Sequence, residues 1–338
     1  MLKIKRLLLF IYAAAFAFIL TSCGDPEAVK TAVSDADPSS ESIIVQASKP
    51  DAQEETQGET AERDAVEDSE AIEETLAETS EEDVPKTTTS SSEGFSFEDV
   101  MGIIYKVSVD PTVRKHDYNW ENLTYENGRA YYEDENYTSL TGIDVSYFQG
   151  DIDWAAVKAD GIDFVIIRLG YRGYGEGTLN TDVKALENID GAHAAGLDVG
   201  VYFFSQAINE EEAEEEADYI MQVLDGRSIE LPIVYDPEEI TDDEARSDGI
   251  TGDQLTRNTL AFCEKIEEYG HETMLYSNMK WEAYKFNLSQ LSDIEIWYAD
   301  YTETPQTPYH FAYWQYSETG SVAGIEGPVD MNIRFIKK

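Results

Sequence analysis

The hydrophobic positions of residues 141–338 follow two different spacings along the chain. Residues 163–170, 198–204 and 231–236 are short, almost wholly apolar runs, which is typical of strands buried on both faces of a sheet. Residues 181–195 and 210–224 instead repeat their apolar side chains at helical spacing. The other predicted strands are 142–146, 273–277, 295–299, 312–316 and 329–332, and the other predicted helices are 154–159 and 251–269.

About eight strands separated by helical segments, in roughly 200 residues, predict an α/β fold with parallel strands and right-handed crossovers. The fold class that fits best is a modified TIM-like (β/α) barrel. An open doubly wound sheet is the alternative. No glycine-rich phosphate loop follows the first strand, so a nucleotide-binding function is less favoured.

The first 23 residues have the pattern of an export signal. Lys3, Lys5 and Arg6 precede an apolar run of about 14 residues, which is short for a membrane span and ends near Cys23. The end of this run resembles a bacterial lipobox, in which the cysteine is lipidated and becomes the new N-terminus. We therefore expect lipidation of Cys23, with an uncleaved anchor or an ordinary signal peptide as the alternatives. Cys263 is the only other cysteine, so no intramolecular disulfide is expected.

Residues 24–94 contain no aromatic residue and are rich in Glu, Asp, Ser, Thr and Ala. Such a segment cannot bury enough apolar surface to offset its ordering entropy, so we predict a disordered acidic linker. Aromatic residues return in residues 95–140, where the pair Asn127 and Gly128 between two short runs predicts a β-hairpin. We predict a small β-rich extension that packs on the main domain, residues 141–338, with a sugar-binding lip as the alternative.

The charge of the chain limits its partners. The formal net charge is −45, of which residues 24–95 carry −17 and residues 96–338 carry −31. Nucleic acid and anionic lipid would repel such a chain, so we expect no nucleic-acid partner.

Acidic residues lie at the ends of the predicted strands, and they are Asp144, Asp236, Glu238, Asp300 and Asp330. In a β/α barrel the functional residues gather at the carboxyl ends of the strands. Asp236 and Glu238 are two positions apart on an extended segment, so both point the same way, about 6.5–7 Å apart. Carboxylates this close shift each other's pKa, which lets one stay protonated near neutral pH, as a glycosidase requires.

The acid pair also has less specific interpretations. A solvated loop is one alternative. A metal site is the other, although the cluster lacks histidine and the acidic run 242–253 does not have the spacing of a calcium loop.

Longer segments resemble one enzyme family. The opening stretch GIDVSYFQGDIDWAAVKADGIDFVIIRLGYRGYG and the later segments AAGLDVGVYFFSQA, LPIVYDPEE, TMLYSN, IWYADY and YWQYSETGSVAGIEGPVDMN resemble, in order, glycoside hydrolase family 25, the lysozymes also called muramidases. The resemblance covers about 200 residues. It implies a modified β/α barrel that cuts the β-1,4 bond between N-acetylmuramic acid and N-acetylglucosamine in peptidoglycan, with no metal or organic cofactor.

The resemblance also implies roles for the acids. Glu238 matches the general acid, and Asp236 matches its partner, which either orients the substrate acetamido group or stabilises the charged transition state. Asp144 and Asp330 match the two flanking active-site acids. Direct displacement by Asp236 and attack by the substrate's own acetamido oxygen both stay open, and the resemblance favours the second. Phe148 and Phe203 depart from the family pattern, because many relatives have histidine there.

Further residues near strand ends are predicted to bind substrate, by stacking on sugar rings or by hydrogen bonding. They are Tyr171, Tyr202, Tyr276, Tyr298, Asp300 and Trp314. For Tyr276 and Trp314, packing in the core is an equal alternative.

The sequence thus predicts an exported, monomeric peptidoglycan hydrolase, lipid-anchored to the outer face of the bacterial cytoplasmic membrane, with its catalytic domain in the cell wall. Two alternatives remain. One is a non-catalytic lipoprotein that binds the wall, and the other is a glycosidase that acts on another glycan such as chitin.

Overall fold

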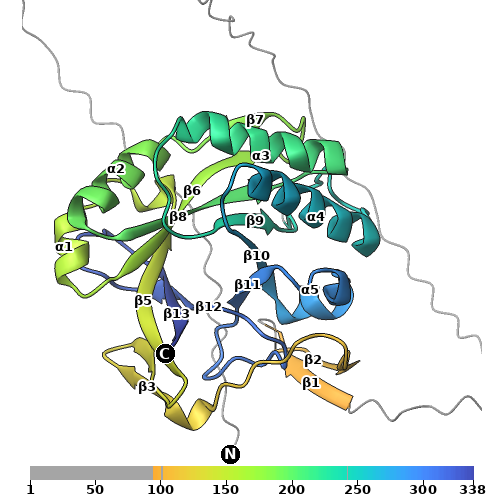
Figure 1. Cartoon of the computed structure of the whole chain (residues 1–338), viewed down its shortest axis with the longest axis horizontal. Coiled ribbons are helices and arrows are strands. Elements are labelled where there is room, and N and C mark those ends of the chain that lie inside the picture. Colours follow the sequence, from red (N-terminus) through yellow and green to blue (C-terminus); the bar gives the residue numbers. More distant parts are fainter. Residues whose placement is uncertain (1–93, 100–101, 242) are drawn as a thin grey trace, which may run out of the picture. The chain divides into compact units, whose positions relative to one another are not determined.

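The computed structural model describes residues 94–99, 102–241 and 243–338 (Figure 1). The predictions for the export signal, for Cys23 and for the linker up to residue 93 lie outside the described residues. The described residues belong to one compact unit. None of the helices in these residues is long and apolar enough to cross a bilayer.

Eight strands form a closed barrel, as predicted, so the open-sheet alternative is wrong. In ring order they are β5 (Tyr137–Val145), β6 (Phe164–Arg172), β8 (Asp198–Ser205), β9 (Ile233–Pro237), β10 (Thr273–Asn278), β11 (Glu295–Ala299), β12 (Tyr313–Gly320) and β13 (Val329–Lys337). The pairing of β13 with β5 closes the ring. A short strand, β7 (Leu179–Thr181), pairs with β6 outside the ring.

The last strand runs against the predicted direction. Six neighbouring pairs in the ring are parallel, but β13 is antiparallel to both β12 and β5. Parallel neighbours need a long crossover, usually a helix, and the connection at residues 321–328 holds none. The chain therefore turns back, and the prediction of parallel strands is wrong for β13.

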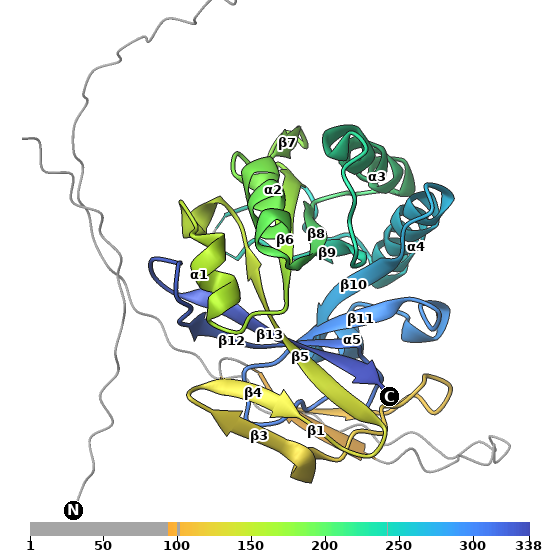
Figure 2. The same ribbon diagram turned by 60° about the vertical axis from the view of Figure 1, so that its left-hand side comes forward.

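Five α-helices lie outside the ring, mostly over its first half (Figures 1 and 2). They are α1 (Trp154–Ala159), α2 (Ala185–Ala195), α3 (Glu210–Leu224), α4 (Gly252–Glu268) and α5 (Met279–Tyr284), with 3-10 turns η1 (Trp120–Asn122), η2 (Tyr147–Gln149) and η3 (Leu288–Gln290). Asn209 caps α3 by accepting a hydrogen bond from the backbone N–H of Glu212, which is why this helix has its predicted bounds. Helix α2 starts four residues later than predicted, because residues 179–181 pair with β6.

The inside of the barrel is apolar in its lower part. Phe164, Ile166, Val234, Met274, Trp297 and Tyr313 form a core cluster of their own, separate from the outer core beneath the helices. Gly142 on β5 makes room for it, because a Cβ there would lie 2.2 Å from the Phe164 ring. Polar side chains occupy the barrel above this layer, so they are shielded from water on one side.

The N-terminal extension covers strands that no helix covers. It contains β1 (Gly94–Glu98) paired with β2 (Ile104–Ser108), and the predicted hairpin, β3 (Leu123–Glu126) with β4 (Arg129–Tyr132). Rings from the extension pack on the outer side of β12 and β13: Tyr118 stacks on Phe335 at 4.1 Å, and Trp120 lies 6.3 Å from Trp314. The Tyr118 hydroxyl also donates to the Phe311 carbonyl at 2.7 Å. These rings therefore serve as core.

Candidate active site

The four matched acids meet at one rim of the barrel. Asp144 is near the end of β5, Asp236 near the end of β9, and Glu238 directly follows β9. Asp330 comes at the start of β13, yet it lies directly opposite Asp144 in the strand register. The antiparallel direction of β13 explains this, because the first residues of that strand share a rim with the last residues of the parallel strands.

Two amides hold the carboxylate of Asp144. Gln315 Nε2 donates to Asp144 Oδ2 at 2.9 Å, and Asn332 Nδ2 donates to the same oxygen at 2.8 Å. Both amides are buried. Tyr276 and Tyr301 each donate a hydroxyl hydrogen bond of 2.8 Å to Gln315 Oε1. These donors fix which end of the Gln315 amide faces Asp144.

Asn332 is oriented in the same way. Its Oδ1 accepts a hydrogen bond of 2.7 Å from the indole N–H of Trp297, so its amino group must face Asp144. We call Gln315, Asn332, Tyr276, Tyr301 and Trp297 the Asp144 network. Four of its members were not predicted as site residues, although Gln315 and Asn332 stand within the segments YWQY and VDMN.

The pKa values of the flanking acids reflect burial. Burial is the main cause that raises the pKa of Asp144 to about 6, and the hydrogen bonds from Gln315 and Asn332 limit that rise. The pKa of Asp330 is raised to about 8, first by burial and then by the charge of Asp144 and the hydrogen bond between the two carboxyl groups. Asp330 therefore keeps a proton at neutral pH and donates it toward Asp144.

Asp236 and Glu238 form the second pair. Asp236 is buried, and its Oδ1 has no hydrogen-bond partner. Burial, together with the charges of Glu238 and Asp144, raises the pKa of Asp236 well above its usual range. The Glu238 side chain is exposed, but the surrounding protein displaces part of the water around its carboxyl group. This desolvation, and then the charge of Asp144, raise the pKa of Glu238 to about 7. The two carboxyl groups come within hydrogen-bonding reach of each other, so the pair holds a shared proton near neutral pH.

Three of the predicted substrate-binding tyrosines lie at or near this rim. Tyr202 is half-buried, and the charge of Asp144 adds to the burial that raises its pKa well above its usual range. Tyr276 belongs to the Asp144 network, with its ring 4.8 Å from that of Trp297. The ring of Tyr171 lies 5.5 Å from the guanidinium of Arg168.

The prediction of substrate binding is wrong for Tyr298 and Trp314. Both are fully buried, facing the outer core: Tyr298 stacks on Phe311 at 5.3 Å, and the Trp314 indole donates to the Asp300 carbonyl at 2.8 Å. The core alternative is therefore correct for Trp314. Nor does Asp300 join the acids, because its carboxylate organises the following loop, accepting from the backbone N–H of Thr302 at 3.0 Å and from the Tyr298 hydroxyl at 3.0 Å.

Arg168 is a further residue near the acids that was not predicted from the sequence. It is the single charged residue among residues 164–171 of β6, which was the available signal. Its Nε donates to Asp182 Oδ2 at 2.9 Å, and its charge offsets part of the rise in the pKa of Asp236. Phe203, the position noted above as a departure, faces outward instead, with its ring 6.1 Å from that of Tyr219 on α3.

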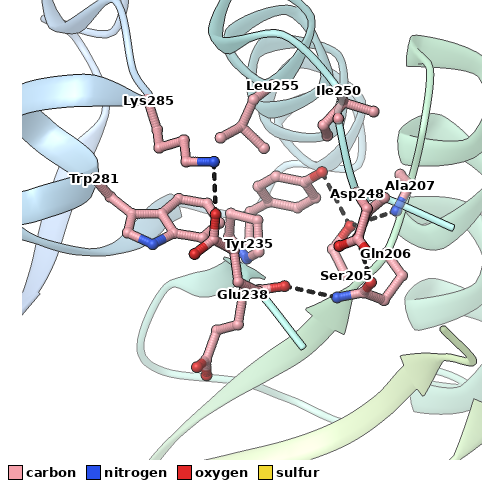
Figure 3. Close-up of a pocket in the computed structure, with 14 residues that line it drawn as sticks. Ser205, Gln206, Ala207, Tyr235, Glu238, Asp248, Ile250, Leu255, Trp281 and Lys285 are labelled. Carbon is pink, nitrogen blue, oxygen red and sulfur yellow. Dashed lines mark hydrogen bonds and ion pairs between the residues drawn. The ribbon is translucent and has the colours of Figure 1, made fainter. Parts of the chain in front are cut away.

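A small cavity of about 70 Å³ lies behind Glu238 (Figure 3). The carboxyl group of Glu238 points away from this cavity, while its backbone carbonyl accepts a hydrogen bond of 2.8 Å from Gln206 Nε2. The next residue, Glu239, forms an ion pair of 2.6 Å with Lys285 on the same side. The cavity thus lies on the side of the backbone opposite to the Glu238 carboxyl group. The hydrogen bond from Gln206 and the ion pair of Glu239, both made by residues that line the cavity, hold the backbone at Glu238 in place.

The described residues contain no group of three or more His, Cys, Asp or Glu side chains arranged to hold a metal ion. The expectation that the reaction needs no metal or cofactor stays a prediction.

Residues 143–325 match the family described as glycosyl hydrolases family 25, which is more than half of the chain. The chain belongs to glycosyl hydrolases family 25. Among curated proteins of similar sequence, this family 25 chain is 30% identical over 195 residues to the autolytic lysozyme of Clostridium acetobutylicum, covering 57% of this chain and 55% of that protein. It is 29% identical over 206 residues to lysozyme M1 of Streptomyces globisporus, covering 58% and 67%. The family 25 chain therefore spans about half the length of the first relative.

Solved structures agree with the family. The spore cortex lytic enzyme SleM of Clostridium perfringens is 26% identical, with a TM-score of 0.51, over 58% of this chain and 67% of that one. The modular autolysin LytC of Streptococcus pneumoniae has a TM-score of 0.52 at 23% identity, over 71% of this chain and 56% of that one, which supports the fold alone.

Proposed function

We propose that this protein is a peptidoglycan hydrolase that cleaves the β-1,4 bond between N-acetylmuramic acid and N-acetylglucosamine, with Glu238 as the general acid. The observation that carries the proposal is the cluster of four interacting acids on the rim of a family 25 barrel. Three of them have pKa values raised to between about 6 and 8, and that of Asp236 is raised as well. The similarity to two lysozymes supports the same assignment.

The exposure of Glu238 suits a general acid. Its pKa of about 7 keeps much of it protonated near neutral pH, and its exposed side chain can reach the glycosidic oxygen of a bound strand. In the first step Glu238 gives its proton to that oxygen, the C1–O bond breaks, and positive charge develops at C1. The charge of Asp144 supports the protonated form of Glu238, because a nearby negative charge disfavours a second one.

The burial of Asp236 suits a residue that orients the acetamido group of the substrate. Its Oδ1 has no partner within the protein, so it is free to accept a hydrogen bond from the acetamido N–H of the substrate. Once the shared proton resides on Glu238, Asp236 is an anion that can orient the acetamido group, whose carbonyl oxygen then attacks C1. Direct attack on C1 by Asp236 is the alternative route.

Glu238→Gln is the test, with Glu239→Gln as the matched control. Glu239 is the neighbouring carboxylate, but it pairs with Lys285 on the cavity side. The full chain, with Cys23→Ser to prevent lipidation, is incubated with purified peptidoglycan, and mass spectrometry identifies the new reducing-end sugars. We expect muramic acid ends from the parent and from Glu239→Gln, and a loss of at least 100-fold in Glu238→Gln.

Other outcomes would select the alternatives. Binding to the wall without cleavage by any variant would make this a wall-binding protein. New ends from chitin but not from peptidoglycan would make it a glycosidase for another glycan.

We also propose that the chain is exported and lipid-anchored through Cys23, and acts as a monomer on peptidoglycan strands of the cell wall. The lipobox-like pattern before Cys23 supports the anchor. Cell fractionation tests it: the parent is expected in the membrane fraction, and Cys23→Ser in the soluble one. An unchanged membrane fraction for Cys23→Ser would contradict lipidation.

A further inference from the structure

Two aromatic rings stand in solvent directly beyond the strand that carries Asp144. Phe148 and Tyr147 lie on η2, which follows β5, and they are 70% and 44% exposed. Their ring centroids are 4.2 Å apart, with 32° between the ring planes. Among the described residues no large apolar side chain on a helix or strand of the barrel is more exposed than Phe148. We call this pair the rim platform.

Local hydrogen bonds hold the rim platform in place. Ser146 Oγ accepts from the backbone N–H of Phe148 at 3.3 Å, and Gln149 Oε1 accepts from that of Ser146 at 2.9 Å, which forms a capping box. Asp182 Oδ2 accepts from the backbone N–H of Tyr147 at 3.1 Å. The two rings are thus presented on an ordered turn, so a ligand that covers them needs little further ordering of the protein.

A cation lies against the rim platform. The guanidinium carbon of Arg168 is 5.1 Å from the centroid of the Tyr147 ring and 5.4 Å from that of Phe148. The Arg168 side chain is only 12% exposed, and Asp182 binds it. Arg168 therefore supports the rings from the protein side, and their exposed atoms face solvent.

The rim platform belongs to the same rim as the acids. Phe148 follows Asp144 by four residues, so their Cα atoms are at most about 14 Å apart. Arg168, beneath the platform, is close enough for its charge to act on the pKa values of Asp236 and Tyr202. A single extended oligosaccharide can therefore contact both the acids and the platform.

We propose that Tyr147 and Phe148 form a sugar-stacking subsite, which binds a pyranose ring of the glycan strand away from the bond that is cleaved. The C–H face of a pyranose is apolar and flat enough to cover an aromatic ring, while its hydroxyl groups stay in water. The neighbouring acids and the charge of −31 on residues 96–338 disfavour an anionic lipid surface as the occupant. The inference rests on the proposed function, since it takes the glycan strand as the ligand.

Phe148→Ala and the double variant with Tyr147→Ala test the subsite. Tyr269→Ala is the matched control, because Tyr269 is 47% exposed but follows α4 at the other end of the barrel. With soluble glycan strands of graded length, Phe148→Ala is expected to raise KM for long strands roughly 2- to 12-fold, the effect of losing a stacked ring. The loss falls on KM rather than kcat, and Tyr269→Ala matches the parent. Equal KM values for Phe148→Ala and the parent, at every strand length, would overturn the subsite.

Binding separates this proposal from the proposed function. Co-sedimentation with peptidoglycan is measured in the Glu238→Gln background, with and without Phe148→Ala. Weaker binding on loss of Phe148 supports the subsite even if the parent cleaves nothing. Equal binding refutes the subsite even if the parent is an active muramidase. A loss of dimers, or of binding to phosphatidylglycerol vesicles, in Phe148→Ala without an effect on glycan binding would also overturn it.

Discussion

Gln315→Met removes one of the two amide hydrogen bonds that stabilise the charge of Asp144. Gln315 donates to Asp144 at 2.9 Å and accepts from Tyr276 and Tyr301 at 2.8 Å each. Methionine has nearly the same length and shape but donates no hydrogen bond. The amide bond from Asn332 and the hydrogen bond from Asp330 stay in place.

The expected size of the effect follows from the energy of that bond. A hydrogen bond to a charged group contributes about 1.5–3 kcal/mol, which corresponds to about one to two pKa units. The pKa of Asp144, about 6 in the parent, would therefore rise to about 7–8. At pH 7 Asp144 would change from about nine tenths ionised to about half or less.

The direction of the change in activity follows from Glu238. The charge of Asp144 helps to raise the pKa of Glu238 to about 7, and it raises the pKa values of Asp330 and Tyr202 as well. With Asp144 neutral, the pKa of Glu238 falls. Since Glu238 must be protonated to act as the proposed general acid, activity is expected to be lost as pH rises through that pKa. The basic limb of the pH profile is therefore expected to move down by up to about one unit.

The assay is kcat/KM for release of reducing ends from peptidoglycan between pH 4 and 9. Gln306→Met is the matched control, since the Gln306 side chain also forms hydrogen bonds, but to the Asp300 carboxylate and the backbone of Glu98. Thermal unfolding shows whether each variant is folded. If folded Gln315→Met has the same basic limb as the parent and the control, the Asp144 network does not set the protonation of Glu238.

Three further predictions concern stability. Tyr118→Ala is expected to lower the free energy of unfolding by about 3–5 kcal/mol, because it removes a buried ring. Tyr118→Phe is expected to lower it by about 1 kcal/mol, because only the hydrogen bond from the hydroxyl group to the Phe311 carbonyl is lost. Urea titration measures the free energy of unfolding of both variants. Gly142→Ala is expected to cost about 1–3 kcal/mol, since its Cβ would lie 2.2 Å from the Phe164 ring, and an unchanged midpoint in urea would contradict this. Burial raises the pKa of Glu282 to about 8, above its unfolded value, so the folded state retains a proton and stability falls as pH rises from about 4.5 to 8. Melting temperatures across that range are expected to fall less in Glu282→Gln than in the parent.

The barrel was predictable because the apolar composition of its strands identifies them in the sequence. Runs such as 163–170 and 198–204 are almost wholly apolar, which is typical of a strand buried on both faces, and they are short for a buried helix. Strand direction has no such local signal. The antiparallel course of β13 depends on the missing helix at 321–328, a segment whose polar composition fits a loop of any kind.

The same apolar runs explain which site residues were missed. In a half-exposed strand, alternation of polar and apolar residues shows which side chains face inward, but a strand buried on both faces has no such alternation. Tyr298 was predicted to face the site, and so was Trp314 as one of two equal alternatives. The side chains that do face it are those of their neighbours Trp297 and Gln315. An error of one position exchanges the two faces. The four matched acids escaped this error because a carboxylate cannot be placed in the outer core without a partner, whereas Asp300 finds its partners in the following loop.

The antiparallel hairpin of β12 and β13 links the fold to the chemistry. It brings Asp330 opposite Asp144, and it also carries Gln315 and Asn332, so one hairpin supplies a proton donor and both amides to the same carboxylate. A hairpin without flanking helices leaves its outer face uncovered, and the rings of the N-terminal extension cover it. We therefore regard the extension as part of the barrel unit, since it supports the strands that set the charge of Asp144.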